Sequence, residues 1–167
     1  MISKNKFTAA WALLLVLFSG CYTFKDVSIP PEVKTIRINY IENKARYINP
    51  QLSPQLTDKL RQKINNQTRL TQVQTDDAHY DVSGTITGYT VSTAAISQQQ
   101  ASSNRLTVTI ELSFKNNLDN TKDFEASVSR NFDFAATLSL QQAEAQLSET
   151  IIQNMVDEIF NRLFSNW

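Results

Sequence analysis

Apolar and polar side chains alternate in four segments of the chain, and each segment predicts a half-buried strand. The segments are residues 33–41, 79–91, 105–114 and 124–134. In the first segment, Ile36, Ile38 and Tyr40 share the apolar face. In the second, the alternation slips by one residue after Gly88, which predicts a β-bulge at that glycine.

Two other segments have apolar residues at every fourth position, which predicts amphipathic helices. The first covers residues 52–66, where Ser53 suits the N-cap and is followed by a proline at the first helical position. The second runs from Leu140 to about Phe164, and Ser139 and Gln142 form a capping box at its start. The apolar face of this second helix is so wide that a sheet or another helix must cover it.

The order strand, helix, three strands, helix predicts an α+β fold. Both helices can lie on one face of a four-stranded, mostly antiparallel sheet (β-α-β-β-β-α), which gives a two-layer sandwich. The other face carries Thr, Ser, Glu and Asp and can face solvent. Residues 92–104 lack a core pattern and predict a long loop at a hairpin tip, which either is flexible or inserts into a partner.

One charged side chain breaks the pattern of the last strand segment. Arg130 falls on the same side of the strand as Phe124 and Phe132. A buried, unpaired guanidinium costs on the order of several kcal/mol. We therefore expect Arg130 to lie at the margin of the sheet, with its head group in solvent or paired with a carboxylate such as Glu144 or Asp133.

The N-terminus has the parts of a secretory signal peptide over residues 1–20. Two lysines supply positive charge, and residues 9–18 form an apolar run. This run is too short to span a bilayer core of about 30 Å. A Ser-Gly pair then precedes Cys21, an order that resembles a bacterial lipobox, although Phe18 stands where Leu is usual.

Cys21 is the only cysteine of the chain, so a disulfide within the chain is excluded. It could be a buried apolar residue or an unpaired thiol, but its position directly after the signal peptide favours lipidation. Several acyl chains anchor a protein firmly, because each buried CH₂ contributes about 0.8 kcal/mol. We predict an anchor at Cys21, a lipidated tether over residues 21–32 and a single domain over residues 33–167.

Charge and composition narrow the classes of function. The chain has 16 basic and 16 acidic residues, and loss of the two signal-peptide lysines leaves 14 basic residues and a net charge of −2. Because there is no basic excess, nucleic-acid binding is not indicated. The richness in Ser, Thr, Asn and Gln suits a β-rich exported protein.

Residues that carry chemistry are few and scattered. His79 is the only histidine, and we expect an ordinary polar residue at the start of a strand, not a metal ligand. Asp76 and Asp77 are typical of a turn. Gly84 and Gly88 do not precede a helix N-terminus that could hold a phosphate. We therefore predict no enzymatic activity, no cofactor and no metal site.

Six stretches, in this order, resemble the LptE family in its Bacteroidetes-type form and together span residues 28–167. They are SIPPEVKTIRI, LSPQLTDKL, DVSGTITGYTVS, NRLTVTIELSFKN, DFEASVSRNFDF and EIFNRLFSNW. The order lipobox, strand, helix, three strands and helix is also the architecture of that family. The resemblance implies an outer-membrane lipoprotein without catalytic activity, on the periplasmic side of the membrane.

The resemblance also implies partners. LptE-like proteins lie in the lumen of the large β-barrel LptD, form the lipopolysaccharide translocon with it, plug and help assemble the barrel, and can bind lipopolysaccharide. A polar, weakly charged surface is compatible with the polar interior of a barrel. Binding of lipid A phosphates needs basic side chains near one another. The candidates are Arg105, Lys115, Lys122 and Arg130.

The alternative function is that of a free-standing, periplasm-facing lipoprotein that binds or carries a lipid or glycolipid. Such a carrier needs an open apolar cavity, whereas two helices are expected to use the whole core face of the sheet. Display on the cell surface would require an acidic signal after the cysteine. The segment YTFKD holds a single acid, Asp26, which favours the periplasmic face.

Overall fold

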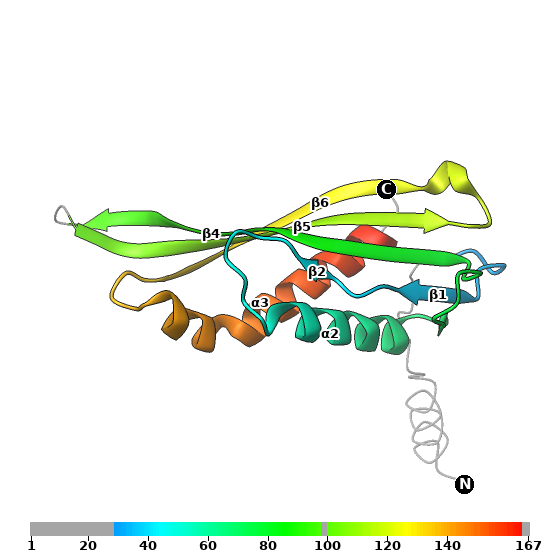
Figure 1. The fold of residues 1–167 in the computed structure, drawn as a ribbon, viewed down its shortest axis with the longest axis horizontal. Coiled ribbons are helices and arrows are strands. Elements are labelled where there is room, and N and C mark those ends of the chain that lie inside the picture. The colour runs from blue at the N-terminus through cyan, green and yellow to red at the C-terminus, as the bar shows by residue number, and fades with distance from the viewer. Residues whose placement is uncertain (1–28, 98–99, 165–167) are drawn as a thin grey trace, which may run out of the picture.

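The computed structural model describes residues 29–97 and 100–164, so Cys21 and the predicted signal peptide lie outside the described residues. Two long helices cover one face of an open sheet (Figure 1). The elements are β1 (Thr35–Ile38), β2 (Glu42–Asn43), α2 (Leu52–Gln67), β3 (Thr71–Gln72), β4 (Tyr80–Ser97), β5 (Gln100–Asn116), the 3₁₀ turn η1 (Asn120–Lys122), β6 (Phe124–Ala135) and α3 (Leu140–Phe164). The α+β class is confirmed, with six strands in place of the predicted four.

The sheet has the strand order β3-β1-β4-β5-β6, and β2 pairs with β4 outside this path. β4, β5 and β6 form the predicted antiparallel meander. β1 runs parallel to both β3 and β4, and β2 runs parallel to β4. β2 and β3 are each two residues long, too short to leave an alternating pattern, and for this reason the sequence predicted neither of them.

The first strand is shorter than expected, and the prediction for Tyr40 is wrong. β1 ends at Ile38, Tyr40 is 53% exposed, and Ile41 is buried in its place. The backbone N–H of Ile41 donates to the hydroxyl of Thr57, on α2, at 3.1 Å. A hydrogen bond that Ile41 donates to the helix α2 thus takes the chain out of the local alternation.

β4 and β5 form a hairpin arm that is much longer than predicted. Of the expected loop over residues 92–104, the described residues 92–97 and 100–104 continue the ladder: Ser92 faces Arg105, and β4 ends only at Ser97. The loop prediction is wrong because backbone pairing does not depend on the apolar side chains that mark a half-buried strand. The far end of the arm projects past the helices (Figure 1).

The predicted bulge at Gly88 is confirmed. Ile86 faces Ile110 and Gly88 faces Thr109, so Thr87 is the extra residue. A Cβ atom at position 88 would lie only 2.9 Å from the Cβ of Thr109, well inside the distance at which carbon atoms attract each other. The close approach of the two strands therefore requires glycine at this position.

Of the two predicted N-caps, one is confirmed. The N–H of Ser139 donates to Oε1 of Gln142 at 2.9 Å, and the N–H of Gln142 donates to Oγ of Ser139 at 3.3 Å. The prediction for Ser53 is wrong, since Ser53 lies inside α2 with its side chain buried and Gln51 occupies the N-cap. Leu52 is buried in the core, and this packing starts the helix two residues earlier than the polar pattern indicated.

The core lies between the helices and the sheet, and its fully buried side chains come from both layers, among them Ile36, Leu60, Ile110 and Met155. Ile29 also packs into this core, and Nη2 of Arg69 donates to the carbonyl of Ile29. Ile29, the first described residue, thus belongs to the packed part of the chain although it lies within the predicted tether.

Candidate functional site

The face of the sheet opposite the helices carries small polar side chains, and we call it the open face. Its centre consists of three rows across β4, β5 and β6. The rows are Thr85–Glu111–Ser127, Gly88–Thr109–Ser129 and Thr90–Thr107–Asn131. No described helix covers this face, because both α2 and α3 pack against the other side (Figure 1).

Hydrogen bonds between neighbouring strands connect the side chains of the open face. The pairs are Thr107 with Asn131 at 2.8 Å, Ser127 with Glu111 at 2.7 Å, and Thr109 with Ser129 at 3.0 Å. Hydroxyl and amide groups keep further hydrogen-bonding capacity after one such bond. The open face can therefore bind water or another polar surface without breaking its own contacts.

An ion pair lies at the end of the open face toward the hairpin tip. Arg105 donates from Nε and Nη2 to the two carboxylate oxygens of Asp133 at 2.7 and 2.9 Å. The hydrogen bond from Arg105 holds the pKa of Asp133 below its usual value. Asp133, predicted as a partner of Arg130, thus pairs with Arg105.

A second polar group lies at the opposite end of the open face. Asp81 faces Lys115 across β4 and β5, and it accepts hydrogen bonds from Arg37 and, at 2.6 Å, from Asn39. The hydrogen bond from Arg37 lowers the pKa of Asp81, with smaller contributions from Asn39 and Lys115. Lys115 itself is exposed to solvent.

Arg130 lies on the helix side of the sheet, as its place in the sequence pattern predicted. It is exposed and pairs with Glu158 of α3. The expectation of a position at the margin and a carboxylate partner is confirmed. The prediction that Glu144 or Asp133 is this partner is wrong, because α3 places the carboxylate of Glu158 beside Arg130.

The structure does not gather the four predicted lipopolysaccharide-binding cations in one place. Arg105 and Lys115 are ten positions apart on one strand, which corresponds to about 33 Å. Lys122 lies in η1, where it pairs with Asp119 at 3.4 Å. Arg130 is on the other face. Lys115 and Lys122 alone lie near the same end of β5.

A cluster around Glu144 was missed by the sequence analysis. The carboxylate of Glu144, on α3, accepts hydrogen bonds from the hydroxyls of Tyr89 and Tyr47 at 2.8 and 3.2 Å and from the amide of Asn49 at 3.1 Å. The two tyrosine rings stack with centroids 5.5 Å apart. Burial and the hydrogen bond to Glu144 raise the pKa of Tyr89. The partners come from segments far apart in the chain, so no local pattern could reveal them.

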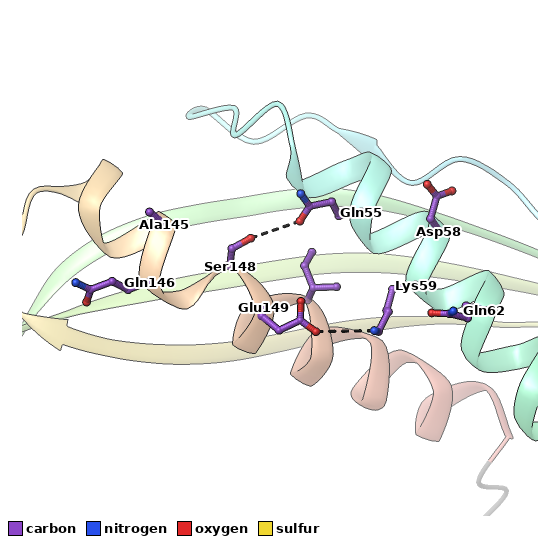
Figure 2. A pocket seen from close by; sticks show the side chains of 9 residues that line it. Gln55, Asp58, Lys59, Gln62, Ala145, Gln146, Ser148 and Glu149 are labelled. Carbon is purple, nitrogen blue, oxygen red and sulfur yellow. Dashed lines mark hydrogen bonds and ion pairs between the residues drawn. The ribbon is translucent and has the colours of Figure 1, made fainter.

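A groove of about 680 Å³ runs between α2 and α3, and Figure 2 shows the side chains that line it. Ser148 donates to Gln55 at 3.4 Å, and Lys59 pairs with Glu149 at 3.8 Å across the groove. A second, more enclosed space beside Tyr89 holds about 10 Å³, hardly enough for one water molecule. The first space is too polar and the second too small for the acyl chain of a lipid.

His79 and Asp76 have structural roles at the start of β4. Nδ1 of His79 accepts the backbone N–H of Lys34 at 3.0 Å, and the N–H of His79 donates to the hydroxyl of Thr35 at 2.9 Å. Asp76 lies in the predicted turn and pairs with Arg37. These contacts join the turn before β4 to β1.

Residues 33–163 match the model of the LptE family, which is described as lipopolysaccharide-assembly. No curated protein matches the chain by sequence.

Solved structures of bacterial proteins resemble this one. A minor lipoprotein from Acinetobacter baumannii has a TM-score of 0.52 and 14% identity, with 78% of this chain and 91% of that chain covered. A hypothetical protein from Chlamydia trachomatis has a TM-score of 0.52 and 7% identity, with 80% and 99% covered. Rare lipoprotein B from Shewanella oneidensis has a TM-score of 0.49 and 12% identity, with 77% and 93% covered. The first two proteins share the fold of this chain.

Proposed function

The chain belongs to the LptE lipopolysaccharide-assembly family, and we propose that it plugs the lumen of an LptD-like outer-membrane β-barrel and helps that barrel assemble. The family match carries this proposal, because it extends over residues 33–163 and so over nearly the whole packed domain. In this role the protein performs no catalysis. Its barrel partner forms with it the translocon that delivers lipopolysaccharide to the cell surface.

The open face supports this proposal. The interior of an outer-membrane barrel is polar, and burial of an unpaired charge against it would be costly. The three central rows of the open face carry hydroxyl and amide groups and a single charged residue, Glu111, whose carboxylate accepts a hydrogen bond from Ser127. A flat surface of this kind can lie against a polar barrel wall with its hydrogen bonds satisfied.

The anchor is proposed to be at Cys21, with the domain on the periplasmic side. Ile29, the first described residue, lies eight positions after Cys21, and a fully extended chain over eight positions reaches about 28 Å. The tether would therefore keep the domain close to the membrane. Among the described residues, no helix combines the length and the apolar character needed to cross a membrane.

Lipopolysaccharide binding is proposed at the end of the domain that carries Lys115 and Lys122. Phosphate groups bind best where several cations converge, and these two lysines lie in neighbouring segments, at the end of β5 and in η1. Arg105 and Arg130 remain candidates. Each of them would have to exchange its carboxylate partner, Asp133 or Glu158, for a phosphate.

The test is an affinity pull-down of the lipidated protein from detergent-solubilised outer membranes, followed by mass spectrometry. We expect a large LptD-like barrel to co-purify. The double variant Thr107→Trp/Ser129→Trp, which adds bulk to the open face, should lose the barrel. The control Gln146→Trp, in the groove between the helices, should keep it.

The pull-down also separates the proposal from its alternative. Recovery of the protein alone, with a bound glycolipid, would refute the plug function and support a free-standing lipid carrier. Equal recovery of the barrel with both tryptophan variants would refute the assignment of the open face. Circular dichroism of each variant shows whether its fold is retained.

A further inference from the structure

The outer edges of the sheet differ in how well they are protected from pairing with a strand of another chain. Free N–H and C=O groups of an edge strand can pair with another chain, and proteins prevent this with short edge strands and with charges, above all charges that point inward. β3 is only two residues long. β6 carries Glu125, Asp133 and the inward-pointing Arg130. Both of these edges are therefore protected.

The outer edge of β4 lacks such protection along the hairpin arm. In the described part of the chain, β4 has partners on this edge only at residues 80–82, from β1, and 85–86, from β2. Residues 88–96 contain no charged side chain. The register is regular from Gly88 to Thr93, between two bulges, and this length is sufficient for a short strand.

Apolar side chains are exposed next to this edge, on its helix side. Val91 is 44% exposed and lies on the same side of β4 as Tyr89. Ile48 is 58% exposed and follows Tyr47, whose ring stacks on that of Tyr89. On the opposite side, toward the open face, the edge carries Thr90. The two sides of the edge thus differ in polarity.

We propose that residues 88–93 of β4 bind an extended strand of the barrel partner, which adds to the sheet by β-augmentation. This inference rests on the proposed function. The edge offers no charge to pair with, so the bound segment is uncharged. Its side chains alternate, with apolar residues facing the side of Val91 and polar residues facing the side of Thr90.

The experiment compares amide hydrogen exchange in the lipidated protein alone and in the complex purified from outer membranes. We expect exchange in residues 88–93 to be slower by about tenfold or more in the complex, because new backbone hydrogen bonds must open first. Val91→Lys places a charge on the helix side of β4, as Arg130 does on β6, and such a charge opposes the addition of a strand. It should lower recovery of the barrel by about tenfold, whereas Gln146→Lys, in the groove between the helices, should not.

The outcomes separate this inference from the proposed function. If the barrel co-purifies and exchange in residues 88–93 is the same with and without it, strand addition is refuted and the plug function stands. If protection appears in the isolated protein and grows with its concentration, a second copy occupies the edge and the barrel does not. If no barrel co-purifies, both proposals fall. Unchanged circular dichroism of Val91→Lys excludes unfolding as the cause of lost binding.

Discussion

The hydroxyl of Tyr89, on β4, donates a hydrogen bond of 2.8 Å to the carboxylate of Glu144, on α3. This bond ties the base of the hairpin arm to the helix layer. Tyr47 and Asn49, from the loop before α2, donate to the same carboxylate. Three parts of the molecule thus meet at Glu144: the base of the hairpin arm, the loop before α2, and α3 itself.

Replacement of Tyr89 by Phe removes one hydrogen bond to a charged acceptor and should lower the free energy of unfolding by about 1.5 kcal/mol. The pKa of Tyr89 is raised above the ordinary 10.0 by burial and by Glu144. The folded protein therefore keeps this proton where the unfolded chain loses it. The stabilisation linked to the raised pKa is complete below about pH 10 and decreases above it.

Urea denaturation at about pH 8 and about pH 11 measures this effect. The variant Tyr89→Phe should lose less stability between the two pH values than the unmodified protein. The control is Tyr40→Phe, which alters an exposed tyrosine and leaves the hydrogen bonds to Glu144 intact. The same pH dependence in both variants would contradict the role of Tyr89.

Asp81 gives a prediction at acid pH. Its pKa is lowered by the hydrogen bond from Arg37, so its stabilisation is complete above the ordinary pKa of 3.8 and is lost as the pH falls through the lowered value. Asp81→Asn should cost about 2 kcal/mol at neutral pH and less in acid. Urea titrations at both pH values test this, and an equal cost at both would contradict it.

The predictions from sequence succeeded where one segment determines its own structure. The bounds of α3 follow from an apolar repeat over 25 residues and from the reciprocal bonds of Ser139 and Gln142. The antiparallel meander follows from three successive alternating segments, with a short turn between the last two. The bulge at Gly88 could be predicted because the alternation of apolar and polar residues slips by one position after this glycine.

The predictions failed where a distant segment determines the outcome. Tyr40 is exposed because Thr57, on α2, holds the neighbouring residue. The hairpin arm continues to Ser97 through backbone pairing alone. Glu144, which has no cationic neighbour to suggest its role, gathers donors from two segments up to 97 positions away. For the candidate site, the sequence predicted a polar face of the sheet. It did not show that the four basic residues proposed to bind lipopolysaccharide are separated.

The two glycines of β4 give a matched pair of variants. A Cβ atom at position 88 would lie 2.9 Å from Thr109, whereas one at position 84 would meet its nearest neighbours, Ile41 and Leu112, at 3.4 Å. Gly88→Ala should therefore lower the free energy of unfolding by about 1 to 3 kcal/mol, and Gly84→Ala should change it by less than about 1 kcal/mol. Thermal denaturation compares them, and an equal effect would contradict the close approach at the bulge.

Removal of the inward-pointing charge on β6 should expose that edge. The side chains of Arg130 and Glu158 are 53% and 33% exposed, so Arg130→Val should change stability by no more than about 1 kcal/mol. It should nevertheless promote concentration-dependent self-association, because an apolar edge strand pairs with others. Analytical ultracentrifugation measures this, with Arg130→Lys as the control. Identical sedimentation of the two variants would show that Arg130 does not protect the edge.

Two serines that look alike in the sequence should respond differently to replacement by alanine. Ser139 accepts the N–H of Gln142 at the start of α3, so Ser139→Ala should cost about 1 kcal/mol. Ser53 lies inside α2, and among the described residues its buried hydroxyl has no hydrogen-bond partner. An unsatisfied buried hydroxyl is itself costly, so Ser53→Ala should leave stability unchanged or raise it. Urea denaturation of the two variants decides, since equal losses would mean that Ser53 also caps its helix and that α2 begins where the sequence predicted.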